Sequence, residues 1–222
     1  MSALNGHIKA FFKSEHGNAI FLIMIAIFLL GMLAKIMVER NSDTAAIASS
    51  TNKKIQTHQI ISRAMNMRNA ATKIVDEGIA AGNIDDVDPS DAVNYQAGDH
   101  RPKLYHPYGG GIQYHEDYKG WTTILIHKNA AVTDVGPSST AEIMAVGSVN
   151  QTLCGAINNK LYGDPAIPML TLAAINALKD GSTAVTLDEG TTCSGLCDGR
   201  AHQCVRDPND SIFVYYHTLY PR

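Results

Sequence analysis

Four cysteines in the last third of the chain are the residues whose types and spacing could do chemistry. Cys193, Cys197, His202 and Cys204 form the pattern C-x3-C-x4-H-x-C, which contains thiolate and imidazole groups that zinc binds. The spacing matches no usual zinc motif. In an exported domain the same cysteines form disulfides instead, and together with Cys154 they allow three pairings. The compartment of this part of the chain therefore decides between disulfides and metal.

A second group of potential metal ligands lies in residues 83–120, among several tyrosines. It consists of His100, His106, His115, Glu116 and Asp117. Their spacing matches no compact site, so the region reads as a surface loop whose tyrosines pack on a sheet beneath it. The sequence contains no G-x-S-x-G, Walker or H-E-x-x-H motif. We therefore expect no enzyme activity, no cofactor and no bound metal.

The elements that position these residues are organised around residues 17–34. This stretch, GNAIFLIMIAIFLLGMLA, contains no charged residue. As a helix it is about 27 Å long at ~1.5 Å per residue, close to the ~30 Å hydrocarbon thickness of a bilayer. It is longer than the apolar core of a removable signal peptide, and Lys35 follows directly. The sequence thus predicts an uncleaved hydrophobic helix that associates with a membrane.

Charges on either side of this stretch favour a cytoplasmic N-terminus. Lys9 and Lys13 precede it, partly offset by Glu15, and the charges behind it nearly cancel. The C-terminal part is then exported, which favours disulfides over thiolates. A formal net charge of −3 with scattered Lys and Arg argues against specific nucleic-acid binding.

The helical pattern continues well past the apolar stretch. Residues 18–77 contain no proline, and Gly31 is the one glycine among them. A second apolar stripe with helical spacing follows, formed by Ala64, Met67, Ala71, Ile74 and Val75. Two helices with a hinge at residues 41–44 are one interpretation, and one long, bent helix is the other and favoured one.

The remaining chain predicts a mixture of short helices and strands. Strands are expected at 121–126, 182–187, 201–205 and 211–220, and either a strand or an amphipathic turn at 140–149. Short helices are expected at 150–161, capped by Asn150 and Gly163, and at 169–178. The expected fold class is α+β: a long N-terminal hydrophobic and amphipathic helix packed on a small, mostly antiparallel sheet.

This arrangement resembles the type IV pilins and pseudopilins. The features that carry the resemblance are a basic leader ending in Gly17, the apolar helix directly after it and a small cysteine-bearing domain. The N-terminus and the stretch LCGAINNKL are also similar to uncharacterised pilin-like proteins of alphaproteobacteria. The chain departs from the family pattern at Leu22, where pilins usually carry glutamate, and at His16, which precedes the glycine.

The resemblance implies a leader (1–17), a long helix (18–82) with a membrane or filament core (18–38), and an exported domain (83–222). It implies cleavage by a prepilin peptidase between Gly17 and Asn18. The side chains expected to form the assembly helix are Ile20, Phe21, Ile23, Ile27, Phe28, Leu30 and Leu33. We expect the disulfides Cys154–Cys204 and Cys193–Cys197, the first joining the short helix to the C-terminal hairpin and the second closing a local loop.

The expected function is therefore that of a structural subunit of a helical filament. Its partners are copies of itself, other filament subunits, the peptidase and the inner-membrane assembly machinery. The subunit resides in the inner membrane before assembly and in a periplasmic or extracellular filament afterwards. The alternative is a single-pass membrane anchor that displays a periplasmic domain and does not polymerise.

Overall fold

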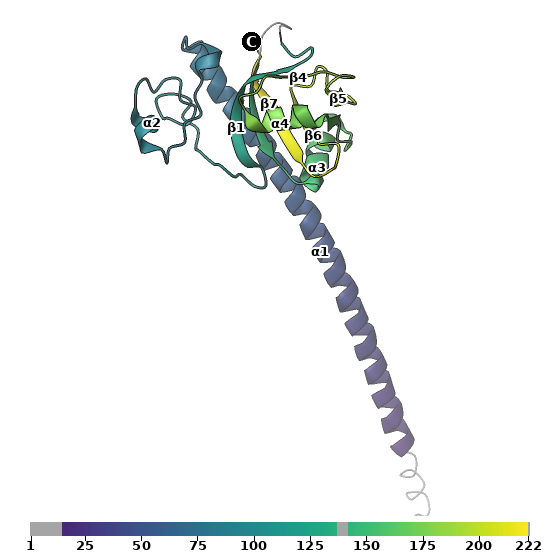
Figure 1. The fold of residues 1–222 in the computed structure, drawn as a ribbon. Coiled ribbons are helices and arrows are strands. Elements are labelled where there is room, and N and C mark those ends of the chain that lie inside the picture. Colours follow the sequence, from purple (N-terminus) through teal and green to yellow (C-terminus); the bar gives the residue numbers. More distant parts are fainter. Residues whose placement is uncertain (1–14, 137–141, 222) are drawn as a thin grey trace, which may run out of the picture. The chain divides into compact units, whose positions relative to one another are not determined.

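The structure is a computed structural model of the 222-residue chain (Figure 1). It describes residues 15–136 and 142–221, with the side chains of residues 15–20, 22 and 36–47 outside the description. The chain divides into two compact units, Met1–Thr51 and Asn52–Arg222. The second unit contains the C-terminal part of the first helix together with the whole sheet.

After the long first helix, a 3-10 helix and a short α-helix precede the first described strand, and the other two described helices lie between strands. The helices are α1 (Glu15–Asp76), the 3-10 helix η1 (Ala81–Asn83), α2 (Ala92–Gln96), α3 (Gln151–Tyr162) and α4 (Leu172–Asp180). The strands are β1 (Thr122–Val132), β2 (Glu142–Ser148), β3 (Met169–Leu170), β4 (Val185–Leu187), β5 (Cys193–Ser194), β6 (His202–Arg206) and β7 (Phe213–Tyr220).

All seven described strands belong to one mixed sheet with the order β4-β1-β2-β7-β6-β3-β5. The central pairs β1–β2, β2–β7 and β6–β7 are antiparallel, as is β3–β5. Two pairs are parallel: β1 with β4, and β3 with β6. The longest strands therefore occupy the centre, and strands of two or three residues extend both edges.

Apolar side chains cover both faces of the central strands. Along β7, Tyr215 and Leu219 belong to one hydrophobic cluster, whereas Val214 and Tyr216 belong to the other. Successive residues of a strand point to opposite faces, so this division is the one that the pleat requires. A strand that is buried on both sides has a nearly continuous apolar and aromatic sequence, as β7 does with FVYYHTLY.

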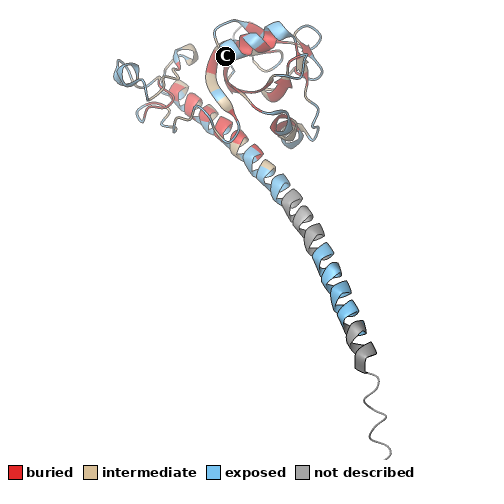
Figure 2. Ribbon diagram, turned by 60° about the horizontal axis from the view of Figure 1, so that its bottom comes forward, coloured by how far each residue is buried: buried red, intermediate tan, exposed pale blue. Residues whose placement is uncertain are grey.

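The C-terminal part of α1 covers one face of the sheet. Ala64, Met67, Ala71 and Ile74 are fully buried in the same cluster as Tyr215. This confirms that the stripe with helical spacing is a packing face. Figure 2 shows the change along α1, from exposed residues nearer its N-terminal end to buried residues in its last turns.

Helix α3 packs on the same cluster, and its ends are set by local sequence. The Asn150 side chain accepts a hydrogen bond from the backbone N–H of Leu153 at 2.9 Å, and Gly163 ends the helix in the left-handed region at φ 75°. Leu153 and Ile157 are buried in the cluster. Both predicted caps of this helix are confirmed.

Helix α4 lies on the opposite face of the sheet. Its residues Ile175 and Leu178 are fully buried with Met144 and Val205 in the second cluster. The sequence predicted a helix at 169–178, but residues 169–170 form strand β3 and the helix begins one residue after its cap Thr171. The sheet is thus the middle of three layers.

The segment between α1 and β1 is held by a buried lysine. Lys103 is 4% exposed, and its Nζ donates hydrogen bonds to the backbone carbonyls of Asn94 (2.7 Å), Tyr95 (2.8 Å) and Ala97. These three bonds use all the donors of the ammonium group. They attach helix α2 and the residues after it to the loop that carries Lys103.

The expected fold class is wrong. Within the described residues, no helix is both long enough and apolar enough to cross a bilayer. The sheet is not a small one with helix on a single face, because it has seven described strands, adds two parallel pairs to its four antiparallel ones and is covered by helices on both faces. The physical reason is that β3 and β5 are too short to show a strand period and gain their place from pairing distant in sequence.

Candidate assembly surface

The apolar segment (residues 20–33) of α1 gathers most of the large exposed apolar side chains of the described chain. Ten of them are between 39% and 66% exposed: Phe21, Ile23, Met24, Ile25, Ile27, Phe28, Leu29, Leu30, Met32 and Leu33. Elsewhere such residues occur singly, as Val93 and Tyr108 do. Single exposed apolar residues are normal on a protein surface, whereas a continuous run marks an interaction surface.

The apolar segment is apolar around its whole circumference. Four consecutive residues, Ile27 to Leu30, are each at least 54% exposed. Because an α-helix has 3.6 residues per turn, four consecutive side chains point in all directions around the axis. A single partner helix covers only one side, so complete burial of this segment requires several neighbours.

The structure describes six of the seven side chains expected on the assembly helix, and all six are exposed. They are Phe21, Ile23, Ile27, Phe28, Leu30 and Leu33. Ile20 lies in α1, but its side chain is outside the described residues. Gly17 and Asn18, the expected processing site, lie in the first turn of α1, and residues 1–14 of the leader are outside the description.

All four cysteines are paired in the described structure. Cys154 of α3 bonds to Cys204 of β6, with Cα atoms 5.3 Å apart, and Cys193 bonds to Cys197, with Cα atoms 6.4 Å apart. These are the two expected pairings. The first disulfide joins the helix to the sheet and closes a long loop, the kind of crosslink that most restricts the unfolded chain. No described cysteine is a free thiol available to a metal.

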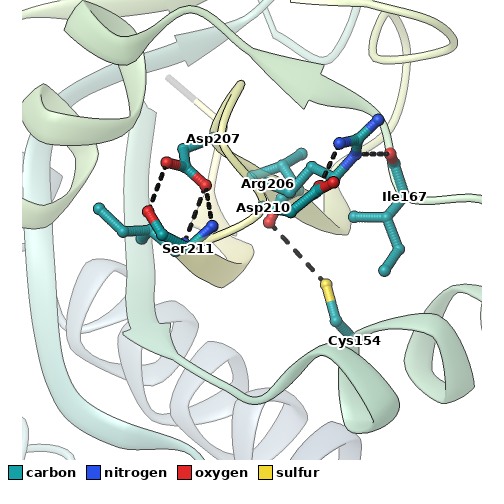
Figure 3. Close-up of polar contacts among 8 residues, drawn as sticks. Cys154, Ile167, Arg206, Asp207, Asp210 and Ser211 are labelled. Carbon is teal, nitrogen blue, oxygen red and sulfur yellow. Dashed lines mark hydrogen bonds and ion pairs between the residues drawn. The ribbon is translucent and has the colours of Figure 1, made fainter.

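A dense hydrogen-bonded turn joins β6 to β7 beside the first disulfide (Figure 3). The Asp207 carboxylate accepts hydrogen bonds from the backbone N–H groups of Ser211 (2.7 Å) and Ile212 (2.8 Å) and from the Ser211 hydroxyl (2.7 Å). Arg206 donates to the Ile167 carbonyl at 3.2 Å and pairs with Asp210. Every carboxylate in this turn is engaged by the turn itself, so the turn is structural.

The described histidines that were considered as metal ligands stack on other rings. They do not form clusters with carboxylates or thiolates. His100 stacks on His106 with ring centroids 4.1 Å apart, and His202 stacks on His217 at 5.0 Å. Among the described residues, no three His, Cys, Asp or Glu side chains are arranged to hold a metal ion. The residues in the pattern C-x3-C-x4-H-x-C are therefore divided between two disulfides and an aromatic stack.

His217 is a buried polar residue that the sequence did not single out. It is 1% exposed, its Nδ1 lies 3.2 Å from the Tyr215 hydroxyl, and its Nε2 has no partner among the described residues. Burial, together with the nearby His202 and Arg68, lowers the pKa of His217 to about 3. Burial also lowers the pKa of His202. Both rings are neutral at pH 7. A fall in pH therefore destabilises this part of the core.

Glu142 shows the opposite effect on β2. It is 1% exposed and accepts a hydrogen bond from the Thr218 hydroxyl at 3.0 Å. Burial raises its pKa to about 6, although the Thr218 bond acts in the other direction. A lone buried carboxylate with a raised pKa is sometimes catalytic, but Glu142 and its partner Thr218 are both buried inside the sheet, 1% and 2% exposed.

Comparison with known proteins adds no functional information. No protein-family model matches the chain, and neither the curated proteins nor the solved structures include a similar one. Evidence on function therefore comes from the residues themselves. Among the described surfaces, the exposed apolar segment gives the strongest indication of a binding partner.

Proposed function

We propose that this protein is a structural subunit that assembles with copies of itself into a filament through its apolar segment. The observation that carries the proposal is the exposure of ten large apolar side chains in residues 21–33. Burying one fully exposed side chain of this size contributes about 1.5–3 kcal/mol, so covering ten that are roughly half exposed contributes on the order of 10 kcal/mol. That is enough to drive association of one chain with several others.

An open assembly fits this surface better than a closed pair. A two-fold dimer covers one side of each helix, whereas the apolar segment is exposed all around. Copies staggered along a common axis bury every side, and a head-to-tail contact that does not close generates a helical filament.

The same proposal includes a route to the filament. Before assembly, lipid covers the uncharged stretch 17–34, and a prepilin peptidase cuts between Gly17 and Asn18. The resemblance of the N-terminus to type IV pilins supports this route. The paired cysteines suit an oxidising periplasmic or extracellular site. The proposed role is structural and includes no catalytic step.

The proposal is tested by removing detergent from the purified processed chain, which begins at Asn18, and examining it by negative-stain electron microscopy. We expect filaments from the natural chain and none from Phe28→Glu, which places a charge in the buried contact. Val93→Glu is the matched control, because Val93 is an exposed apolar residue of α2 outside the segment. The proposal fails if Phe28→Glu assembles as the natural chain does, or if the natural chain stays monomeric.

A further inference from the structure

A polar groove lies in the C-terminal unit, between the last turns of α1 and the loop before β1. Its volume is 620 Å³, within the usual range of small-molecule sites. It is lined from α1 by Ser62, Arg63, Asn66, Asn69, Ala70 and Lys73, and from the loop by Gly110, Ile112, Gln113, His115 and Tyr118. Among the described residues, this lining contains two cations, Arg63 and Lys73, and no carboxylate.

The polar residues from α1 lie on one face of the helix. Ser62, Asn66, Asn69 and Lys73 follow one another at intervals of four, three and four residues. Residues spaced by three or four lie one above another on a helix surface. They form a row of hydrogen-bonding groups along one wall of the groove, opposite the loop.

Arg63 is the most unusual residue of this lining. It is 7% exposed, and its Nη2 donates to the backbone carbonyl of Gln113. Its Nε is buried without a partner among the described residues, and the Tyr118 ring centroid lies 5.8 Å from its Cζ. A guanidinium has five N–H donors, so most of its capacity is unused by the described protein.

The charge of Arg63 is also uncompensated. No ion pair joins it to a carboxylate within the described chain. Burial lowers the pKa of its guanidinium, but an arginine stays protonated in proteins. Asp117, which precedes Tyr118 in the chain, accepts with its carboxylate from the Thr123 backbone N–H at 3.1 Å. A buried cation without an anion is costly, and an anion entering the groove removes that cost.

Lys73 adds a second positive charge to the groove. Its Nζ donates to the Gly109 carbonyl at 2.8 Å and lies 3.8 Å from a Glu77 carboxylate oxygen, one turn along the helix. The Lys73 side chain is 51% exposed, so solvent weakens that pairing. Lys73 therefore remains able to contact an anion, while Arg63 provides the planar donor group that binds carboxylates and phosphates in a bidentate manner.

We propose that this groove binds a small molecule bearing an oxyanion, a phosphate or a carboxylate, held by Arg63 and Lys73. The row of serine and asparagine side chains supplies further hydrogen bonds to the rest of the ligand. This site is independent of the apolar segment, because all its residues lie in the unit Asn52–Arg222.

The test is isothermal titration of the full chain in detergent with inorganic phosphate and with acetate, at ionic strength held constant with sodium chloride. We expect saturable binding of at least one of the two anions, and the anion bound more tightly identifies the ligand group. Arg63→Gln is expected to weaken that binding at least tenfold, and Lys73→Gln several-fold. Lys160→Gln, which removes an exposed cation of α3 outside the groove, is expected to leave it unchanged.

Three outcomes overturn the proposal. The first is the absence of saturable binding of either anion to the natural chain. The second is an equal loss of affinity in Lys160→Gln and Arg63→Gln, which shows diffuse attraction to positive charge. The third is anion binding unchanged in Lys73→Gln, the variant that decides the matter if circular dichroism shows Arg63→Gln to be unfolded.

Discussion

Acid should destabilise the C-terminal unit through His217, and the size of the effect follows from its burial. The ring is neutral in the folded chain with a pKa of about 3, whereas an ordinary histidine has a pKa of 6.5. Between these values the unfolded chain binds one more proton than the folded chain, so the free energy of unfolding falls as pH falls. From pH 7 to pH 5 the loss from His217 is about 2 kcal/mol.

Glu142 opposes this loss in the same pH range. Its folded pKa of about 6 lies above its ordinary value of 4.5, so the folded chain takes up a proton first and gains stability as pH falls. That gain is about 1 kcal/mol between pH 7 and pH 5. His202, whose pKa burial lowers, adds to the loss. Measuring the natural chain alone therefore does not isolate His217.

The decisive comparison is between the natural chain and His217→Asn, which keeps a polar group beside Tyr215 and cannot titrate. Urea unfolding of the full chain in detergent, followed by the fluorescence of the single, fully buried Trp121, gives the free energy at each pH. We expect the change from pH 7 to pH 5 to be smaller by about 2 kcal/mol in the variant. His58→Asn, at an exposed position, should behave as the natural chain does. Equal pH dependence in His217→Asn and the natural chain would refute the reasoning.

Three further predictions test other parts of the molecule. Ile74→Asp places an unpaired charge in the core and should lower the free energy of unfolding by about 4 kcal/mol or more, measured by urea unfolding; an unchanged midpoint contradicts the packing of α1 on the sheet. Lys103→Met leaves three carbonyls without their donor and should cost about 2–4 kcal/mol by the same assay, whereas Lys160→Met at an exposed position should cost little. N-terminal sequencing of the protein recovered from cells should begin at Asn18, and an intact Met1 argues for an unprocessed anchor.

Periodic and capping signals were the parts of the fold that could be predicted from the sequence. The stripe containing Ala64 and Ile74 recurs at helical intervals, and burial follows directly from that period. Asn150 and Gly163 each satisfy helix ends through local geometry, which needs no distant partner. Such features depend on a few neighbouring residues, so they are visible in one sequence.

Features created by distant pairing could not be predicted. Strand β3 has two residues and exists because it pairs with β5 and β6, more than twenty residues later in the chain. Nothing local indicates that α4 covers the second face of the sheet, and this is why a two-layer fold was expected. A small sheet is a local interpretation, and pairing between distant segments produced a sheet of seven described strands instead.

The candidate sites divide in the same way. The apolar segment is evident from composition alone, because a run of uncharged residues needs no fold to be recognised. Arg63 and Lys103 read as ordinary surface cations on a helix and in a loop. In the structure both side chains are buried. Arg63 keeps donors without partners, whereas Lys103 uses all of its donors, and both results depend on the loop between α1 and β1.

Site-specific photocrosslinking at Phe28 in intact cells tests the central claim most directly. A benzophenone amino acid replaces Phe28 in the full chain, and irradiated cells are analysed on denaturing gels, with the same replacement at Val93 as the control. Assembly through the apolar segment predicts a ladder of products at successive multiples of the chain mass from position 28 and none from position 93. Products limited to lipid adducts of a single chain, or to one dimer band, would contradict it.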